Sequence, residues 1–208
     1  MRWIALLLSL GGAFSPGFAQ SPPMEHHHVS GNETAPAASM LAMREPGLKI
    51  PDLALVDQNG RTVHFYKDLI EGRTVAINFI FTTCTTICLP MGANFAHLEK
   101  MLGGRAGREV NLISVSIDPE TDTPARLKDW AGKFHGGPGW TLVTGSKPEV
   151  DRLLKALGAF TADKQDHSAL ALIGNARAGE WIRQNALASP DAFLRQLDRM
   201  SAMKAATK

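Results

Sequence analysis

Cys84 and Cys88 are the only cysteines of the 208-residue chain, and three residues separate them in the segment 79–91 (FIFTTCTTICLPM). A β-rich apolar run precedes the pair, so we expect Cys84 in a loop after a strand and Cys88 in the first turn of a helix. Residues four apart on a helical turn lie on one face, which lets both sulfurs point at one spot. Free N–H groups and the positive dipole at a helix start favour the thiolate form. The pattern predicts a metal site or an exchanging dithiol.

A short structural disulfide is the alternative reading of the cysteine pair. So small a loop would give little stabilisation by closure, and a domain of this size has little need of it. Thioredoxin-type oxidoreductases favour two residues between their cysteines. A third residue turns the second sulfur about 100° further around the helix. That geometry leaves room for a metal between the sulfurs, although it does not forbid a disulfide.

His167 is the candidate for a third metal ligand. It stands in the segment 165–168 (QDHS), directly before an apolar run that we expect to form a late strand. Soft thiolates select Cu(I), whereas imidazole is a ligand for both copper oxidation states, so Cu(II) would need such a nitrogen donor. In a thioredoxin-like fold the loop that enters this strand lies beside the active-site helix. A single histidine is also commonly a surface residue, and the residue pattern alone leaves its role open.

The elements that must position these side chains follow the order of one α/β domain. A hairpin around Asn59-Gly60 comes first, three strand–helix units follow, and a second hairpin around Gly174-Asn175 precedes a final helix. Thr123 is expected to cap the second of the long helices, with Pro124 as its first residue. We predict a thioredoxin-like fold, a central mixed sheet flanked by helices, with an added N-terminal β-hairpin. Strands are expected over 74–81, 110–117, 141–143, 169–173 and 180–184.

The N-terminal part of the chain has a different composition from the rest. Residues 1–19 combine a positive start, an apolar run and small residues before a cleavage point after Ala19, as in a secretory signal peptide. A retained membrane anchor is the alternative, although a spanning helix needs about 20 apolar residues. We assign residues 20–46 to a disordered tether and 47–203 to the folded domain. The expected location is the periplasm or an equivalent extracytoplasmic compartment, with membrane association if the anchor is retained.

The formal net charge is only +2 and the basic residues are scattered, which argues against a nucleic-acid-binding surface. The tether contains a second group of metal-binding side chains. Its thioether and imidazoles would bind copper only weakly, and a solvated segment that binds nothing is an equal alternative. This auxiliary group consists of Met24, His26, His27 and His28.

Taken together, these segments resemble the Sco/SenC family of copper proteins involved in cytochrome oxidase assembly. The matching pieces stand in the family's order between about Leu48 and Met200. The resemblance implies that Cys84, Cys88 and His167 are copper ligands. The pieces are FIFTTCTTIC (79–88), SVSIDPETDTPARLKDWAGKF (114–134), WTLVTGSKPEV (140–150) and DHSALALI (166–173).

The resemblance also indicates a nearby acidic residue, Asp118, that supports the ligands or contacts a partner. A turn residue ahead of Pro119 is the alternative reading of Asp118. The chain departs from the family where a proline usually follows the first cysteine, because Thr85 stands there, and Pro90 is one position later than usual. We do not expect these departures to abolish binding by two cysteines and a histidine.

Three functions follow as expectations. The first is a metallochaperone that delivers copper to the CuA site of cytochrome c oxidase or to a similar exported cuproprotein. The second is a thiol–disulfide reductase, in which Cys84 and Cys88 would be catalytic and act on the cysteines of an oxidase subunit or another exported protein. The third is a copper or redox sensor that acts through a protein partner. Whether the chain is an enzyme therefore stays open.

Overall fold

The computed structural model describes residues 42–203. The expected signal segment and the auxiliary group Met24, His26, His27 and His28 lie outside the described residues. Residues 43–44, which we assigned to the tether, pair with Arg183 and Ile182 and so form an edge strand of the sheet. Between residues 42 and 203, none of the helices has the length and apolar character needed to span a membrane.

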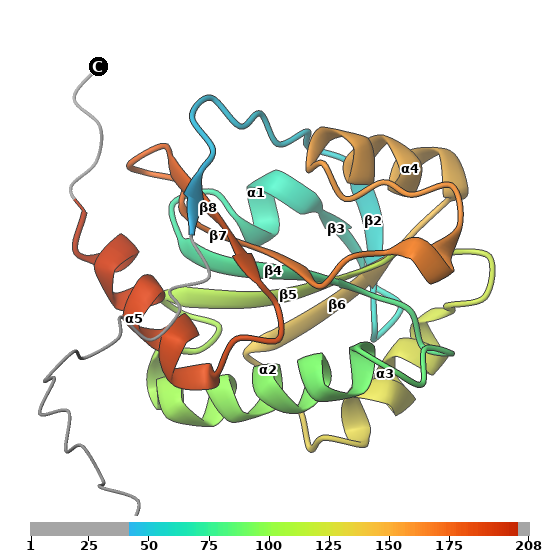
Figure 1. Cartoon of the computed structure of the whole chain (residues 1–208). Helices are drawn as coiled ribbons and strands as arrows, with labels where there is room; N and C mark the ends of the chain where they lie inside the picture. Colours follow the sequence, from blue (N-terminus) through green and yellow to red (C-terminus); the bar gives the residue numbers. More distant parts are fainter. Residues whose placement is uncertain (1–41, 204–208) are drawn as a thin grey trace, which may run out of the picture. The chain divides into compact units, whose positions relative to one another are not determined.

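One mixed sheet runs through the described domain, with the strand order β1-β8-β7-β4-β5-β6-β2-β3 (Figure 1). The central strands β4, β5 and β6 are parallel, and the strands toward both edges are antiparallel. Every residue of β4 and β5 is buried, as expected for strands covered on both faces. The strands are β1 Met43–Arg44, β2 Ala54–Asp57, β3 Thr62–His64, β4 Thr74–Ile80, β5 Val110–Ser116, β6 Trp140–Thr144, β7 Leu170–Asn175 and β8 Glu180–Asn185.

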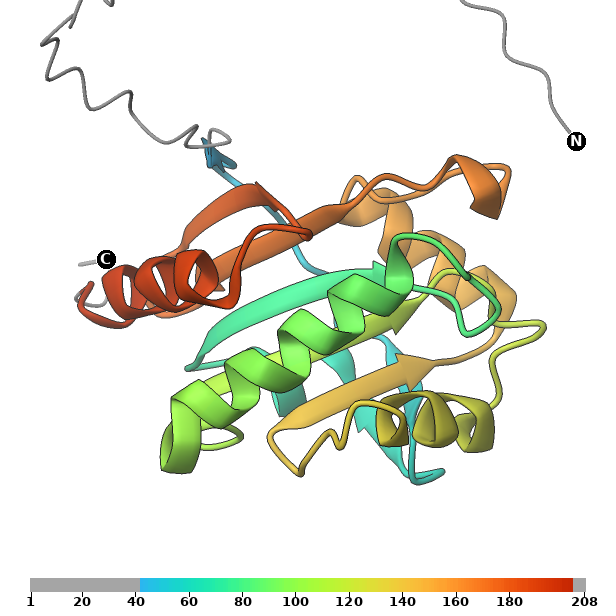
Figure 2. The same ribbon diagram turned by 60° about the horizontal axis from the view of Figure 1, so that its bottom comes forward.

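Helices cover both faces of this sheet (Figure 2). One apolar core lies between the sheet and α2, α3 and α5, and a second core lies between the opposite face and α1 and α4. This mixed sheet between two helical layers confirms the predicted thioredoxin-like class. The helices are α1 Phe65–Leu69, α2 Cys88–Leu102, α3 Pro124–Gly132, α4 Lys147–Ala156 and α5 Pro190–Ser201.

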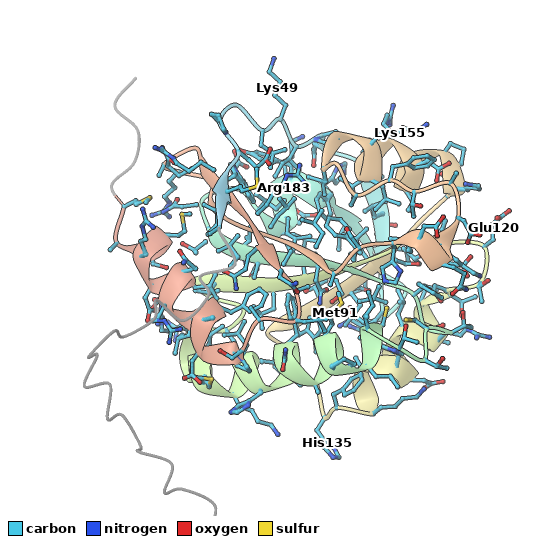
Figure 3. The ribbon with its side chains drawn as sticks, viewed as in Figure 1. Lys49, Met91, Glu120, His135, Lys155 and Arg183 are labelled. Atoms are coloured by element: carbon cyan, nitrogen blue, oxygen red, sulfur yellow. The ribbon has the colours of Figure 1, made fainter. Side chains whose placement is uncertain are left out.

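The start of α2 lies close to α3, and this is possible because Gly92 has no side chain. A Cβ atom on Gly92 would come within 2.7 Å of the Trp130 ring and 2.5 Å of the Phe134 ring. Figure 3 shows Met91, the residue before Gly92, between α2 and the strands, where its side chain is fully buried. The tight contact holds the first turns of α2, which carry Cys88, against the core.

The N-terminal hairpin β2–β3 is present as predicted. Gly60 has a φ of +80° in its turn, a conformation that favours glycine. The buried carboxylate of Asp57 accepts hydrogen bonds from the backbone N–H groups of Asn59 and Arg61. The predicted capping of α3 is also confirmed, because the Thr123 hydroxyl accepts a hydrogen bond from the N–H of Arg126.

The second hairpin, β7–β8, turns later than the sequence pattern predicted. Gly174 and Asn175 are the last residues of β7, and the turn follows over residues 176–179. Gly174 has a packing role, because a Cβ atom there would lie 2.2 Å from the Trp181 ring. Asn175 stabilises the turn through its side chain, which accepts from the N–H groups of Arg177 and Ala178. Gly174 therefore serves the packing between the strands, and Asn175 ends β7 and stabilises the turn that follows.

Candidate metal centre

The cysteine pair lies where the chain leaves β4 and enters α2. The N–H of Cys84 donates to the Phe81 carbonyl at 3.1 Å, which turns the loop back toward the helix start. Cys88 is the first residue of α2, and its N–H donates to the Cys84 sulfur at 3.5 Å. This confirms the predicted loop and helix positions. Both side chains are buried, with Cys84 6% exposed and Cys88 fully enclosed.

His167 reaches the same point from a distant part of the chain. It follows a short 3-10 helix, η2 (Lys164–Asp166), and precedes β7. Its Nε2 lies 3.4 Å from the Cys88 sulfur, while its Nδ1 lies 2.9 Å from the Lys164 carbonyl. A carbonyl only accepts, so the proton belongs on Nδ1 and the Nε2 lone pair faces the sulfurs. The ring is held edge-on against Phe81 with 5.1 Å between centroids.

Within residues 42–203, the side chains that could hold a metal ion together are Cys84, Cys88 and His167, through two sulfurs and one imidazole nitrogen. All three ligand atoms lie within 4.8 Å of one another. Metal bonds of about 2.0–2.3 Å at trigonal angles need ligand atoms about 3.5–4 Å apart, so only small adjustments are required. Thiolate and imidazole are the donors that soft or borderline metals such as copper prefer, and a structural zinc site usually has four ligands. The donor set fits copper.

The two thiols differ in their acidity. Burial opposes ionisation of Cys84, but hydrogen bonds from the Thr86 hydroxyl and from Cys88 outweigh it and lower the pKa of the Cys84 thiol. Burial raises the pKa of Cys88 to about 12, and the neighbouring Cys84 adds to this effect. In the absence of a metal, Cys84 is therefore the more readily ionised sulfur. A metal cation would favour loss of both protons.

His167 is held in its neutral form. Burial lowers the pKa of the ring, and the hydrogen bond to the Lys164 carbonyl opposes this only in part. Neutral imidazole has the free lone pair that a metal needs, whereas imidazolium has none. Its environment therefore prepares His167 for metal binding near neutral pH.

Asp118 contacts the segment that carries the histidine. Its carboxylate lies 2.6 Å from the ammonium group of Lys164, whose carbonyl holds the His167 ring. Burial opposes ionisation of this carboxyl, yet the Lys164 contact outweighs it and lowers the pKa of Asp118. Asp118 also turns the chain after β5, because its carbonyl accepts from the N–H groups of Thr121 and Asp122. Asp118 is therefore a turn residue that also contacts Lys164, and its role in supporting the ligands or contacting a partner stays a prediction.

Asp122 and Lys164 were not singled out by the sequence patterns. Asp122 is fully buried, and its carboxylate accepts from the N–H and hydroxyl of Thr82 and from the Ser116 hydroxyl. It thereby joins the loop that carries Cys84 to the end of β5. A signal was available, because Asp122 stands in the same segment 114–134 as Asp118. Its inward direction depends on how the two loops meet in space.

Comparison with known proteins adds to this geometry. The family model described as SCO1/SenC matches residues 42–178. A SCO1 protein homolog of Bacillus subtilis is 36% identical over 108 residues, which are 51% of this chain and 53% of that protein. A SCO2-like protein of Rickettsia conorii is 29% identical over 128 residues, or 61% of this chain and 60% of the relative. The chain thus spans little more than half the length of these relatives.

Two solved structures share the fold and part of the sequence. BsSco, a member of the Sco family of cytochrome c oxidase assembly proteins, is 27% identical, with a TM-score of 0.63 over 78% of this chain and 99% of that one. Bradyrhizobium japonicum ScoI with copper bound is 26% identical, with a TM-score of 0.60 over 76% and 99% of the two chains. The family match covers most of the chain and includes both cysteines and the histidine. The chain belongs to the SCO1/SenC family.

Proposed function

We propose that this protein binds one copper ion through Cys84, Cys88 and His167 and delivers it to the CuA site of cytochrome c oxidase or to a similar exported cuproprotein. The convergence of the ligand atoms within 4.8 Å carries the proposal. Cys84 lies in the loop before α2 and Cys88 is the first residue of that helix, whereas the third ligand comes from a segment 79 residues beyond Cys88. A related protein, Bradyrhizobium japonicum ScoI, has been solved with copper bound, which supports the choice of metal.

The site is suited to releasing its cargo as well as to binding it. Three ligands leave one side of a Cu(I) ion open to an incoming thiolate, so copper can pass between proteins by ligand exchange. Cys84 is the less buried sulfur, whereas Cys88 is fully enclosed and contacts His167. We therefore infer that an acceptor approaches on the side of Cys84 and the half-buried His167 ring, and that the enclosed Cys88 is displaced last.

Copper titration of the reduced full chain tests the proposal. We expect one copper per chain, with thiolate-to-Cu(II) charge-transfer bands in the oxidised form, and loss of stoichiometric binding in Cys84→Ser, Cys88→Ser and His167→Ala. His97→Ala is the matched control, because His97 is an exposed histidine on α2. If the double variant Cys84→Ser/Cys88→Ser still bound one copper per chain, the proposed site would be wrong.

A thiol–disulfide reductase is the second candidate, and the unequal thiols favour it. A lowered pKa suits Cys84 to attack a substrate disulfide, and enclosure suits Cys88 to resolve the mixed disulfide from within. Cys88→Ser should then trap a mixed disulfide through Cys84, and Cys84→Ser should trap none. His167 is superfluous to this chemistry. A His167→Ala variant with full activity in cells would favour the reductase, whereas loss of oxidase assembly would favour the chaperone.

We also propose that residues 1–19 direct export and that residues 20–46 tether the domain, apart from the short strand β1. The site would then face an extracytoplasmic compartment, where its acceptor is an oxidase subunit or another exported protein. N-terminal sequencing of the mature protein tests this, with a start at Gln20 as the expected result. Recovery of uncleaved chain in the membrane fraction would instead support a retained anchor.

A further inference from the structure

Three arginines gather at the end of the sheet opposite the metal centre, around a cavity of about 450 Å³. Arg73 precedes β4, Arg108 precedes β5 and Arg177 lies in the β7–β8 turn. The sheet register explains how these distant residues meet. Thr74 pairs with Val110 on one side and with Asn175 on the other, so the residues just beyond these pairs share one edge. We call this cavity the arginine pocket.

The positive charge of the arginine pocket is not neutralised by the surrounding chain. Within residues 42–203, none of its three guanidinium groups has a carboxylate within 4.0 Å. Arg73 donates to a neutral acceptor, the Asn111 side-chain oxygen, at 3.2 Å. Glu109, an acidic residue of the pocket wall, lies 3.6 Å from Arg105, outside the pocket. The concentration of positive charge at a concave site attracts an anion.

The other groups in the wall suit an oxygen-rich anion. The hydroxyls of Thr74 and Ser201 lie 3.1 Å apart and add hydrogen-bonding groups beside the guanidinium groups. Gly72 contributes no side chain, and a Cβ atom there would lie 3.5 Å from the Arg177 Nε. Guanidinium groups present paired N–H donors that match phosphate oxygens, which makes arginine the preferred residue for phosphate recognition.

From these contacts we infer that the arginine pocket binds a phosphate-bearing anion, either a phospholipid headgroup or a soluble phosphate compound. The residues that line the pocket belong to the start of β4, the end of α5 and the β7–β8 turn, and these elements lie on the left in Figure 1. Cys84 lies beyond the other end of β4, and the seven residues of that strand span about 20 Å. The anion is therefore bound far from the copper ligands and does not compete with copper.

Calorimetric titration of the copper-free full chain with inorganic pyrophosphate at low salt tests this inference. We expect saturable binding of one anion per chain. The variant Arg73→Gln/Arg108→Gln/Arg177→Gln should bind at least about tenfold more weakly. The control Lys49→Gln/Lys128→Gln/Arg152→Gln removes the same charge from exposed positions on other parts of the domain, and it should keep the affinity within about twofold. Figure 3 shows the control residue Lys49 reaching into solvent away from the sheet.

Two further measurements keep the inference falsifiable if the triple variant folds poorly. Amide resonances of the wild-type chain should shift on pyrophosphate addition at Gly72 and Asn175 and stay unchanged at Cys84. Cosedimentation with phosphatidylglycerol vesicles, with phosphatidylcholine as the neutral comparison, distinguishes the sources. Arginine-dependent capture by the anionic vesicles identifies a lipid headgroup, and pyrophosphate binding without such capture identifies a soluble phosphate. No saturable binding, equal weakening in both triple variants, or shifts elsewhere would overturn the inference.

Discussion

At the scale of single residues, the two cysteines have identical chemistry but different surroundings. Cys84 accepts hydrogen bonds from its neighbours at the helix start, whereas Cys88 is enclosed beneath it and lies against His167. Hydrogen bonds to a thiolate stabilise the charged form, and enclosure in an apolar core destabilises it. Such a pair can hold a metal with both sulfurs or divide the roles of attack and resolution between them.

The first prediction concerns the order in which the thiols react. In the reduced, metal-free protein at pH 7.5, Cys84 should be alkylated by iodoacetamide at least about tenfold faster than Cys88, because only the thiolate attacks. The lowered pKa of Cys84 and the raised pKa of Cys88 both act in this direction. Timed quenching followed by peptide mass spectrometry measures the two rates. Faster labelling of Cys88 would contradict the described surroundings of the pair.

At the same scale, Asp122 is a buried carboxylate that links two loops. Asp122→Asn replaces one acceptor oxygen by an NH₂ group, so either the Thr82 hydroxyl or the Ser116 hydroxyl loses its acceptor. We expect the free energy of unfolding to fall by about 1–3 kcal/mol, and copper affinity to fall as the Cys84 loop loosens. Urea unfolding and copper competition measure the two effects. Asp129→Asn, on the exposed side of α3, is the control and should change neither.

At the scale of elements, the segment before β7 brings the histidine to the cysteines, and one ion pair fixes it to the loop after β5. Lys164 has two roles there, since its ammonium group contacts Asp118 and its carbonyl accepts from the His167 ring. The position of the His167 ring therefore depends on Asp118, because Lys164 contacts both residues. The side chain of Lys164 also lies over the Phe81 ring, 5.6 Å from its centroid.

The third prediction is the pH dependence of this ion pair. Lys164 lowers the pKa of Asp118 in the folded state, so the pair stabilises the fold above the ordinary carboxyl range. This contribution is lost as the pH falls through the lowered pKa. Lys164→Met should therefore cost about 1 kcal/mol near pH 7, a modest value because the lysine is partly exposed, and progressively less as the pH falls below the ordinary carboxyl range.

Urea unfolding of wild type and Lys164→Met across this pH range measures the difference. Lys155→Met, on the exposed face of α4, is the control for loss of a lysine without the Asp118 contact. A difference between Lys164→Met and wild type that is the same at pH 3 and pH 7 would show that the carboxylate charge is not involved.

At the scale of the whole molecule, the metal centre joins parts of the chain that are distant in sequence and are also held together by the sheet and by the contact between Phe81 and His167. Cys84 and Cys88 belong to the β4–α2 unit, and His167 precedes β7, which pairs antiparallel with β4. A ligand that binds only the folded state stabilises it in proportion to the logarithm of its concentration over Kd. Copper should therefore stabilise the entire domain rather than one loop.

The fourth prediction follows from this linkage. A saturating Cu(I) concentration about 100 times the Kd should raise the free energy of unfolding by about 2.7 kcal/mol, less any contribution from copper bound to the unfolded chain. Scanning calorimetry should show a higher Tm for the wild type and an unchanged Tm for Cys84→Ser/Cys88→Ser. A copper-dependent rise in Tm that survives in this double variant would assign the effect to another site.

Local sequence patterns are sufficient to predict most helices and strands of this protein and the positions of the two cysteines. The apolar runs of β4 and β5, the Thr123 cap and the placement of Cys88 in the first turn of α2 are predicted correctly, because each depends on neighbours within a few residues. The turn of the β7–β8 hairpin is predicted too early. Gly174 is glycine to accommodate Trp181, a contact across strands that has no signature in the local sequence.

The remaining features depend on how distant segments meet. His167 is singled out by its position before a strand, but its 3.4 Å approach to Cys88 requires the β4–β7 pairing and the hydrogen bond to Lys164. The local sequence does not reveal that Asp122 is buried or that the three arginines of the pocket lie together. Burial and the register of the sheet decide both features. Propensity and periodicity act over a few residues, whereas acidity, burial and convergence are set by neighbours that only folding brings together.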